Sequence, residues 1–328
     1  MGNDASPRHA AGSRGKARTR PGGIALALLL AAACASPPPA PARPREDRVS
    51  ISFAPGSRRA TDEGVRRWVL ASVSQVASIY GEFPFAPIEV RVEPVRGGGG
   101  DPVVFGQATG TGGNPVVRLL LREDADDASL RRDWVAVHEL LHLAMPSIRG
   151  DDAWLSEGWA TWATEFLRAR EGLQTEQEAW TEVLLGFQRG RPPTGRTLAE
   201  DSRLLHRTHA YMRVYWGGAA IALLLDADLR RGPEGRTLDD ALRAMRDMEL
   251  ADAEEVPAEE WMERLDGWLG RPLFSTTAEA CLASREFPPV EAVLADLGVS
   301  LRGGRAVLDD AAPGADARRA MTAPSRRP

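Results

Sequence analysis

Cysteine is almost absent from this chain of 328 residues, which has only Cys34 and Cys281. Small secreted domains without a large core usually depend on several disulfides. Because Cys34 lies in a candidate export signal, the two cysteines provide no disulfide framework. We therefore expect Cys281 to be a free, buried thiol and the fold to depend on its apolar core.

The sequence also lacks an apolar run long enough to cross a bilayer as a stable helix. Residues 24–33 form a run of ten, whereas a transmembrane helix needs about 20. A basic segment precedes the run, as in a secretory signal peptide. The run ends in LAAAC, which places Cys34 where bacterial lipoprotein signals are cleaved and lipidated. Ordinary signal cleavage and an uncleaved anchor fit the same pattern.

The N-terminal segment therefore predicts an exported protein, with residues 1–34 as a signal peptide that ends in a lipidation site. The Pro-rich residues 35–48 would hold the folded part away from a membrane surface. We expect a lipid-anchored protein that faces the periplasm or the exterior of a bacterium.

An excess of basic residues is missing as well. The formal net charge is −5, and it falls to −9 without residues 1–33, which contain five basic residues and one acidic residue. Proteins that bind nucleic acids present a basic stripe to the phosphates, so this balance argues against such a partner. The Gly-rich turn at 97–100 also lacks the lysine of a phosphate-binding loop.

The most informative pattern that is present is HELLH at residues 138–142. On a helix, His138 and His142 project from one face, one turn apart. This spacing lets two imidazoles reach a single tetrahedral zinc ion. Glu139 is one position round the helix, where its carboxylate can face a metal-bound water and accept a proton. Two unrelated histidines on a helix surface are the plain alternative.

The spacing of apolar residues predicts one helix that contains this motif. Its apolar stripe consists of Leu130, Trp134, Val137, Leu141 and Ala144. Asp126 and Asp127 suit its start, where carboxylates face the positive end of the helix dipole, and Pro146 marks its end.

A second helix is predicted around WLSEGWATW at 154–162, capped by Asp151 or Asp152. Its buried stripe consists of Leu155, Trp159, Trp162 and Phe166, and its polar face of Glu157, Thr161 and Glu165. A catalytic zinc site needs a third protein ligand. Glu157 is the candidate, provided that the polar faces of the two helices meet.

The two motifs together resemble the gluzincin zinc peptidases, the clan of thermolysin and aminopeptidase N, whose third ligand is a Glu in a W-L-x-E-G-x-A run. The resemblance implies that one Zn²⁺ per chain is bound by His138, His142 and Glu157, and that Glu139 is the general base. Thr161 stands where thermolysin has an aspartate. A hydroxyl can still accept a hydrogen bond from a ligand imidazole, although it orients the ring less firmly.

The run YWGGAAIALLLDADLRR at 215–231 is similar to the glycyl aminopeptidase branch of this clan and to peptidase-MA-like domains. The resemblance implies that Tyr215 stabilises the oxyanion, whereas a core tyrosine is the alternative. Gly217 and Gly218 inside a helix predict a close approach near the metal. We expect His206 and His209 to be surface or capping residues, with a role in substrate binding left open.

The resemblance implies an α+β fold, a thermolysin-like gluzincin catalytic domain at 49–310 with a flexible tail at 311–328. A small sheet lobe and a mainly helical lobe would hold the zinc between them. Strands are expected at 49–53, 88–93, 103–107 and 116–121, and further helices at 58–80, 175–188, 208–231, 239–248, 258–269 and 290–297. Residues 103–121 are our choice for a sheet edge that pairs with the substrate, with an ordinary surface pair as the alternative.

The predicted function is zinc-dependent hydrolysis of peptides or proteins outside the cytoplasm. A catalytically weak, metal-stabilised binding or assembly lipoprotein is an alternative, as is a zinc hydrolase of a non-peptide amide or ester. Glu139 argues against the binding protein, because a structural zinc site uses four ligands and no base. Aminopeptidase N relatives hold the free amine of the substrate with a Glu, whereas the segment here offers only Asp101. The choice between exo- and endopeptidase therefore stays open.

Overall fold

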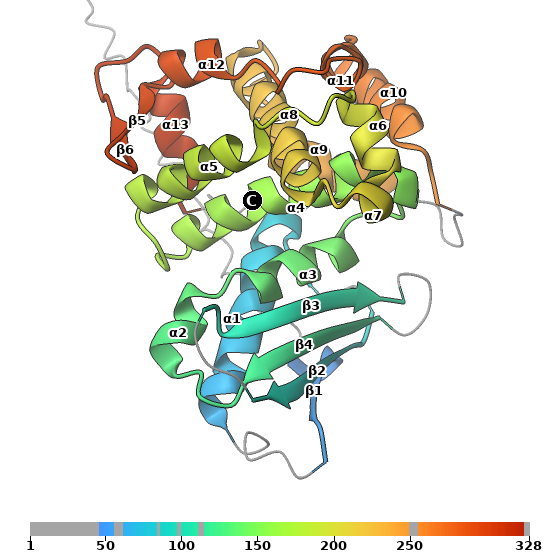
Figure 1. The fold of residues 1–328 in the computed structure, drawn as a ribbon, viewed down its shortest axis with the longest axis vertical. Coiled ribbons are helices and arrows are strands. Elements are labelled where there is room, and N and C mark those ends of the chain that lie inside the picture. Colours follow the sequence, from blue (N-terminus) through green and yellow to red (C-terminus); the bar gives the residue numbers. More distant parts are fainter. Residues whose placement is uncertain are drawn as a thin grey trace, which may run out of the picture. The chain divides into compact units, whose positions relative to one another are not determined.

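The computed structural model describes residues 46–55, 62–83, 86–96, 100–110, 115–248 and 255–324. All of them belong to one unit of the chain, residues 39–328. The predicted signal peptide at 1–34 and most of the linker at 35–48 lie outside the described residues, so export and lipidation stay predictions. In Figure 1, helix α3 lies between a small sheet below it and a mainly helical part above it.

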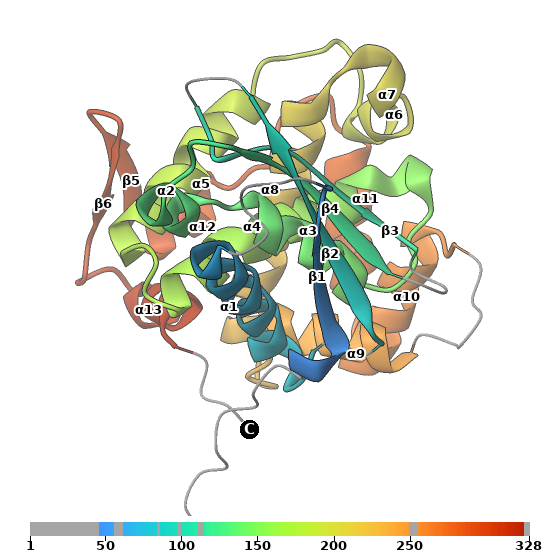
Figure 2. The same ribbon diagram turned by 90° about the horizontal axis from the view of Figure 1, so that it is seen from below.

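Four short strands form the sheet. They are β1 (Val49–Phe53), β2 (Ile88–Val95), β3 (Val103–Thr109) and β4 (Val116–Arg122), in the order β1-β2-β4-β3. The first two pairs are parallel, and β3 joins β4 antiparallel. Burial alternates most clearly along the inner two strands, β2 and β4. Figure 2 shows the strands side by side from β1 to β3. The predicted pair at 103–121 is thus formed, and β3 is an edge strand of the sheet.

Helix α1 (Glu63–Tyr80) ends where the helix predicted at 58–80 does, but it begins later, at Glu63. The Asp62 side chain caps it by accepting hydrogen bonds from the backbone N–H groups of Gly64 and Val65. Its apolar face is buried at Val65, Val69, Val73, Val76 and Ile79. This face anchors the N-terminal part of the chain to the core.

The single helix predicted around HELLH is instead two helices, α2 (Asp127–Arg132) and α3 (Val135–Ala144). Asp133 has extended backbone angles, φ −63° and ψ 140°, and separates them. Its buried carboxylate accepts the Ala136 N–H at 3.0 Å and so caps α3. As a consequence, Trp134 does not join the buried stripe, and 38% of its surface is exposed.

The second motif lies on α4 (Ala153–Arg170), which follows a short 3-10 helix, η2 (Gly150–Asp152). Its predicted apolar stripe is buried throughout. Asp152 occupies the predicted N-cap position, but its carboxylate accepts the Ala258 N–H at 2.9 Å rather than an N–H of α4. Ser202, which is distant in sequence, accepts the Trp154 N–H at 3.1 Å and satisfies the start of α4.

Helix α4 crosses α8 (Tyr211–Arg231) at a pair of glycines. A Cβ atom on Gly218 would lie 2.7 Å from the Cα of Gly158, and one on Gly217 would lie 2.9 Å from Leu198. The predicted close approach at these glycines is therefore a helix–helix contact, made beside the candidate ligand Glu157. The helix begins at Tyr211 rather than at 208 because His209, with φ 57°, ends a separate short helix, α7 (Leu205–Thr208).

The other helices complete the core around α4 and α8, and their bounds agree with most of the predicted ones. They are η1 (Glu46–Arg48), α5 (Glu176–Gly190), α6 (Leu198–Arg203), α7 (Leu205–Thr208), α9 (Leu238–Met248), α10 (Ala258–Leu269), α11 (Phe274–Leu282) and α12 (Glu291–Asp296). Cys281 is free and buried, as expected. Among the described residues, no helix combines the length and the apolar character that crossing a membrane requires.

The C-terminal region differs from the predicted flexible tail at 311–328. A hairpin of β5 (Val299–Arg302) and β6 (Arg305–Leu308) is followed by α13 (Ala315–Thr322). Arg318 on α13 is completely buried, and it donates hydrogen bonds to the carbonyl oxygens of Leu297 and Asp309 and to the Glu176 carboxylate. A buried guanidinium needs such partners, so it holds α13 against the domain.

Candidate metal centre

Two helices bring three ligand atoms together. His138 and His142 project from α3, and Glu157 projects from the first turns of α4. The two Nε2 atoms lie 3.2 Å apart. The Glu157 Oε2 lies 3.1 Å from the Nε2 of His138 and 3.3 Å from that of His142. These residues form the group of metal-ligating side chains found in the described part of the chain.

The spacing of the ligand atoms fits a tetrahedral metal. Bonds of about 2.0–2.1 Å at tetrahedral angles place neighbouring ligand atoms about 3.3 Å apart. The three measured separations, 3.1, 3.2 and 3.3 Å, lie close to this value. Two imidazoles and a carboxylate are also a donor set typical of catalytic zinc, which keeps a fourth position open.

Neighbouring groups shift the pKa values of Glu157 and His142. Burial alone would raise the pKa of Glu157, but the charges of His142 and His138 and their hydrogen bonds lower it strongly. Burial would lower the pKa of His142, but the carboxylates of Glu157 and Glu139 raise it overall. The carboxylate is therefore ionised over the whole ordinary pH range, as a ligand must be.

Glu139 stands beside the ligands without joining them. Burial raises its pKa above the ordinary value, and the charges of His138 and His142 oppose that rise. The Ala108 backbone N–H on edge strand β3 donates a hydrogen bond to it. A Cβ atom on Gly106 would lie 2.6 Å from the Glu139 Cγ, so only glycine lets β3 pass this closely. Glu139 thus lies between the metal ligands and the sheet edge.

Two aromatic side chains flank His138. The Tyr215 ring from α8 stacks on it, with centroids 6.1 Å apart and planes 17° apart, and Trp134 meets it edge-on at 5.6 Å. Burial, the Glu157 charge and a hydrogen bond to Glu157 raise the pKa of the Tyr215 phenol. The phenol is therefore protonated at neutral pH and can donate a hydrogen bond.

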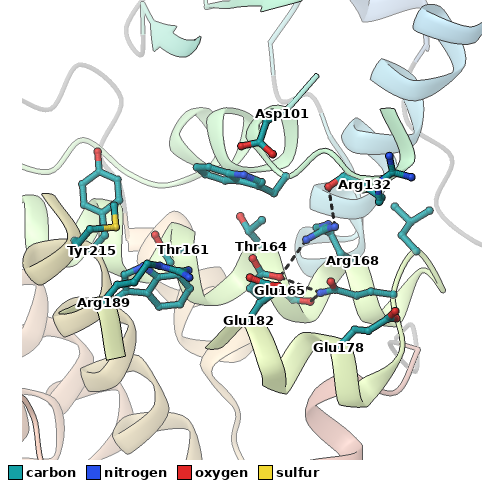
Figure 3. A pocket seen from close by; sticks show the side chains of 15 residues that line it. Asp101, Arg132, Thr161, Thr164, Glu165, Arg168, Glu178, Glu182, Arg189 and Tyr215 are labelled. Carbon is teal, nitrogen blue, oxygen red and sulfur yellow. Dashed lines mark hydrogen bonds and ion pairs between the residues drawn. The ribbon is translucent and has the colours of Figure 1, made fainter. Parts of the chain in front are cut away.

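Among the described residues, Thr161 accepts no hydrogen bond from a ligand imidazole. The His138 Nδ1 is buried and has no hydrogen-bond partner. Thr161, one turn after Glu157, instead lines a neighbouring cavity of about 550 Å³. Figure 3 shows this cavity, with Tyr215 at one end, Arg168 towards the other, and Thr161 and Thr164 between them along α4.

The structure also places the remaining candidates. His206 and His209 are exposed and contact the Tyr211 ring, with centroids 6.4 and 5.9 Å away, and they are not among the ligand group. Asp101 lines the cavity of Figure 3. Sequence reasoning missed Trp134 as a wall of the site, because its helical spacing indicated a core position. Its place just before α3 follows from the Asp133 cap.

No protein-family model matches this chain, and no curated protein matches it in sequence. Its structure is similar to that of an aminopeptidase N family protein from Idiomarina loihiensis, with 18% identity and a TM-score of 0.58 over 77% of this chain and 48% of that one. An M1 zinc metallopeptidase from Deinococcus radiodurans gives 20% identity and a TM-score of 0.46, over 72% of this chain and 48% of that one.

The chain thus spans about half the length of the solved structures that it resembles. At such low identity, the likeness concerns the fold. It confirms the predicted mixed α and β architecture, and it confirms the resemblance to gluzincin metallopeptidases at the level of the fold.

Proposed function

We propose that this chain is a zinc-dependent peptidase that acts outside the cytoplasm. The observation that supports the proposal best is the convergence of His138, His142 and Glu157 at separations that fit a tetrahedral ion. Glu139 stands beside this group as a carboxylate that is free to act as a base. The fold, which is similar to that of an aminopeptidase N family protein, agrees with such chemistry.

The roles of the side chains follow from their positions. When bound, zinc supplies a Lewis acid that polarises a carbonyl group and acidifies water. Glu139 takes the proton of the attacking water and returns it to the leaving amine, and its raised pKa suits both transfers. Tyr215 donates a hydrogen bond to the carbonyl oxygen as negative charge develops on it.

Edge strand β3 supplies a place for the peptide itself. The N–H of Ala108 points away from β4 to Glu139, so this side of the strand faces the catalytic group. An extended substrate can add to such an edge through backbone hydrogen bonds. The reacting carbonyl would then lie next to Glu139.

A metal-stabilised binding or assembly protein is the second candidate from the sequence. A structural zinc site is closed by four protein ligands, whereas three meet here in the described residues. Glu139 has no use in such a site.

The proposed location outside the cytoplasm rests on the signal-like residues 1–34 alone.

The decisive experiment measures metal content and hydrolysis of a quenched peptide library by the full chain, by Glu139→Gln and by Glu157→Ala. We expect one equivalent of zinc and peptide cleavage in the unchanged protein. Glu139→Gln should retain zinc and lose cleavage by a factor of about 10² or more. Glu157→Ala should lose both. Bound zinc without cleavage of any peptide would contradict the peptidase and favour the binding protein.

A further inference from the structure

Several exposed apolar side chains stand on elements that border the candidate metal centre. The large apolar side chains that are exposed in the described part of the chain are Val104, Phe105, Trp134, Met212 and Val307. All except Val307 stand on elements that border the site, namely β3, the start of α3 and the first turn of α8. Two of them, Trp134 and Met212, line the same cavity, and apolar groups that collect at one place on a soluble protein mark a binding site.

The cavity of Figure 3 has apolar walls as well as charged ones. Trp134 and Met212 line it together with Tyr215 and Trp216. Trp134 and Tyr215 also flank His138, so the cavity and the metal centre share two walls. Its volume of about 550 Å³ lies within the range of ligand pockets, about 300–1,000 Å³. A group bound there would therefore lie directly beside the reacting atoms.

The cavity is lined by both acidic and basic side chains, so it does not favour a ligand of either charge. The acidic residues are Asp101, Glu165, Glu178 and Glu182, and the basic ones are Arg132, Arg168 and Arg189. Arg168 pairs with Glu165 at 3.1 Å, and the Arg189 guanidinium lies over the Trp216 ring at 5.3 Å. A charged side chain would thus leave water and meet both signs, which offers it little net gain.

Thr161 adds one polar contact near the metal. Only 9% of its surface is exposed, and the hydrogen bonds of the described residues include none from its hydroxyl. Figure 3 shows Thr161 between Tyr215 and Thr164 along α4. Its hydroxyl is available to a backbone or ring-edge polar group of a ligand that enters the cavity.

We propose that this cavity binds a large apolar side chain, above all an aromatic one, of the residue directly beside the bond that is cleaved. The inference rests on the proposed peptidase function and names its substrate class. Trp134 and Met212 are the specificity-determining residues, because they combine exposure with a place on the cavity wall. Burial of such a side chain supplies binding free energy that a small side chain lacks.

Matched quenched peptides test the inference. They carry Phe, Ala, Glu or Lys at each of the two positions next to the cleaved bond. We expect kcat/KM to be about tenfold or more higher for Phe than for Ala at one of these positions, with no such gain for Glu or Lys. Trp134→Ala and Met212→Ala should each reduce the Phe-to-Ala ratio. Val307→Ala, a matched exposed apolar residue on β6, should leave the ratio unchanged.

The outcomes separate this inference from the peptidase itself. Cleavage that depends on Glu139 but shows no Phe preference, or a preference for a charged residue, would overturn the inference alone. An unchanged Phe-to-Ala ratio in both Trp134→Ala and Met212→Ala, with zinc content retained, would do the same. If no peptide is cleaved, the peptidase fails. Fluorescence anisotropy then decides on the cavity, because tighter binding of Phe than of Ala peptides supports it and equal binding overturns it.

Discussion

At the scale of single residues, the site depends on burial to set the protonation of its groups. Burial raises the pKa of Glu139, and burial together with Glu157 raises that of Tyr215. Glu139 is thereby a better proton acceptor than an exposed carboxylate, and the Tyr215 phenol remains a hydrogen-bond donor at neutral pH. The carboxylate of the candidate ligand Glu157 shows the opposite shift because two histidines lie beside it.

Tyr215→Phe tests the assigned donor. The change keeps the ring that stacks on His138 and removes only the hydroxyl. We expect kcat to fall by a factor of about 10²–10³ with little change in KM, because a donor to the developing oxyanion is lost. Tyr211→Phe is the matched control, since Tyr211 lies edge-on to Tyr215 on the same helix. Equal losses in both variants would contradict the role of Tyr215.

The candidate ligands could be predicted from the sequence because their spacing is local. His138 and His142 need only one helical turn to share a face. The distance from them to Glu157 depends on how α3 packs against α4, and no local pattern encodes it. Trp134 was wrongly predicted to lie in the core. Its exposure depends on where α3 begins, which the apolar pattern does not encode either.

At the scale of elements, the boundary between α2 and α3 determines where the candidate ligands His138 and His142 point. Asp133 ends one helix by its extended backbone and caps the next by accepting the Ala136 N–H. Helical periodicity runs through this position without interruption, so the pattern of apolar residues predicts one long helix. A side chain that competes with the backbone for its hydrogen bonds produced the break.

Asp133→Asn tests how this cap depends on pH. Burial raises the pKa of Asp133 from 3.8 to about 7. Between these values the carboxyl ionises in the unfolded chain but stays protonated in the folded one, so its contribution to stability falls as pH rises. The amide keeps a capping oxygen and cannot ionise. We therefore expect the variant to gain stability relative to the unchanged protein between pH 4 and pH 8, by a few kcal/mol.

The measurement is urea unfolding of both proteins across this pH range. Titrating groups that the substitution does not affect contribute equally to both proteins. Their contributions therefore cancel in the difference between the two free energies of unfolding. Parallel curves for the two proteins would show that Asp133 has the same pKa in the folded and unfolded states, and would contradict the assigned burial effect.

At the scale of the whole molecule, contacts between distant segments organise the helical part. Arg318 reaches Glu176 and the Leu297 carbonyl, and Ser202 satisfies the start of α4. Sequence reasoning missed both, because neither contact leaves a periodic pattern. It predicted the sheet strands, α1, α5 and α10 well, since their apolar faces repeat regularly. The polar composition of the C-terminal region concealed a helix whose buried arginine is satisfied by residues far along the chain.

Zinc should also join distant parts of the fold, because α3 packs on β3 whereas Glu157 belongs to α4. A ligand that binds only the folded state stabilises it, by about 4 kcal/mol at a concentration 1,000 times its Kd. We therefore expect a chelator to lower the melting temperature and added zinc to restore it. Glu139→Gln should respond like the unchanged protein, because Glu139 is no ligand, whereas Glu157→Ala should respond much less. A chelator response of equal size in Glu157→Ala would show that the metal that stabilises the fold is bound elsewhere.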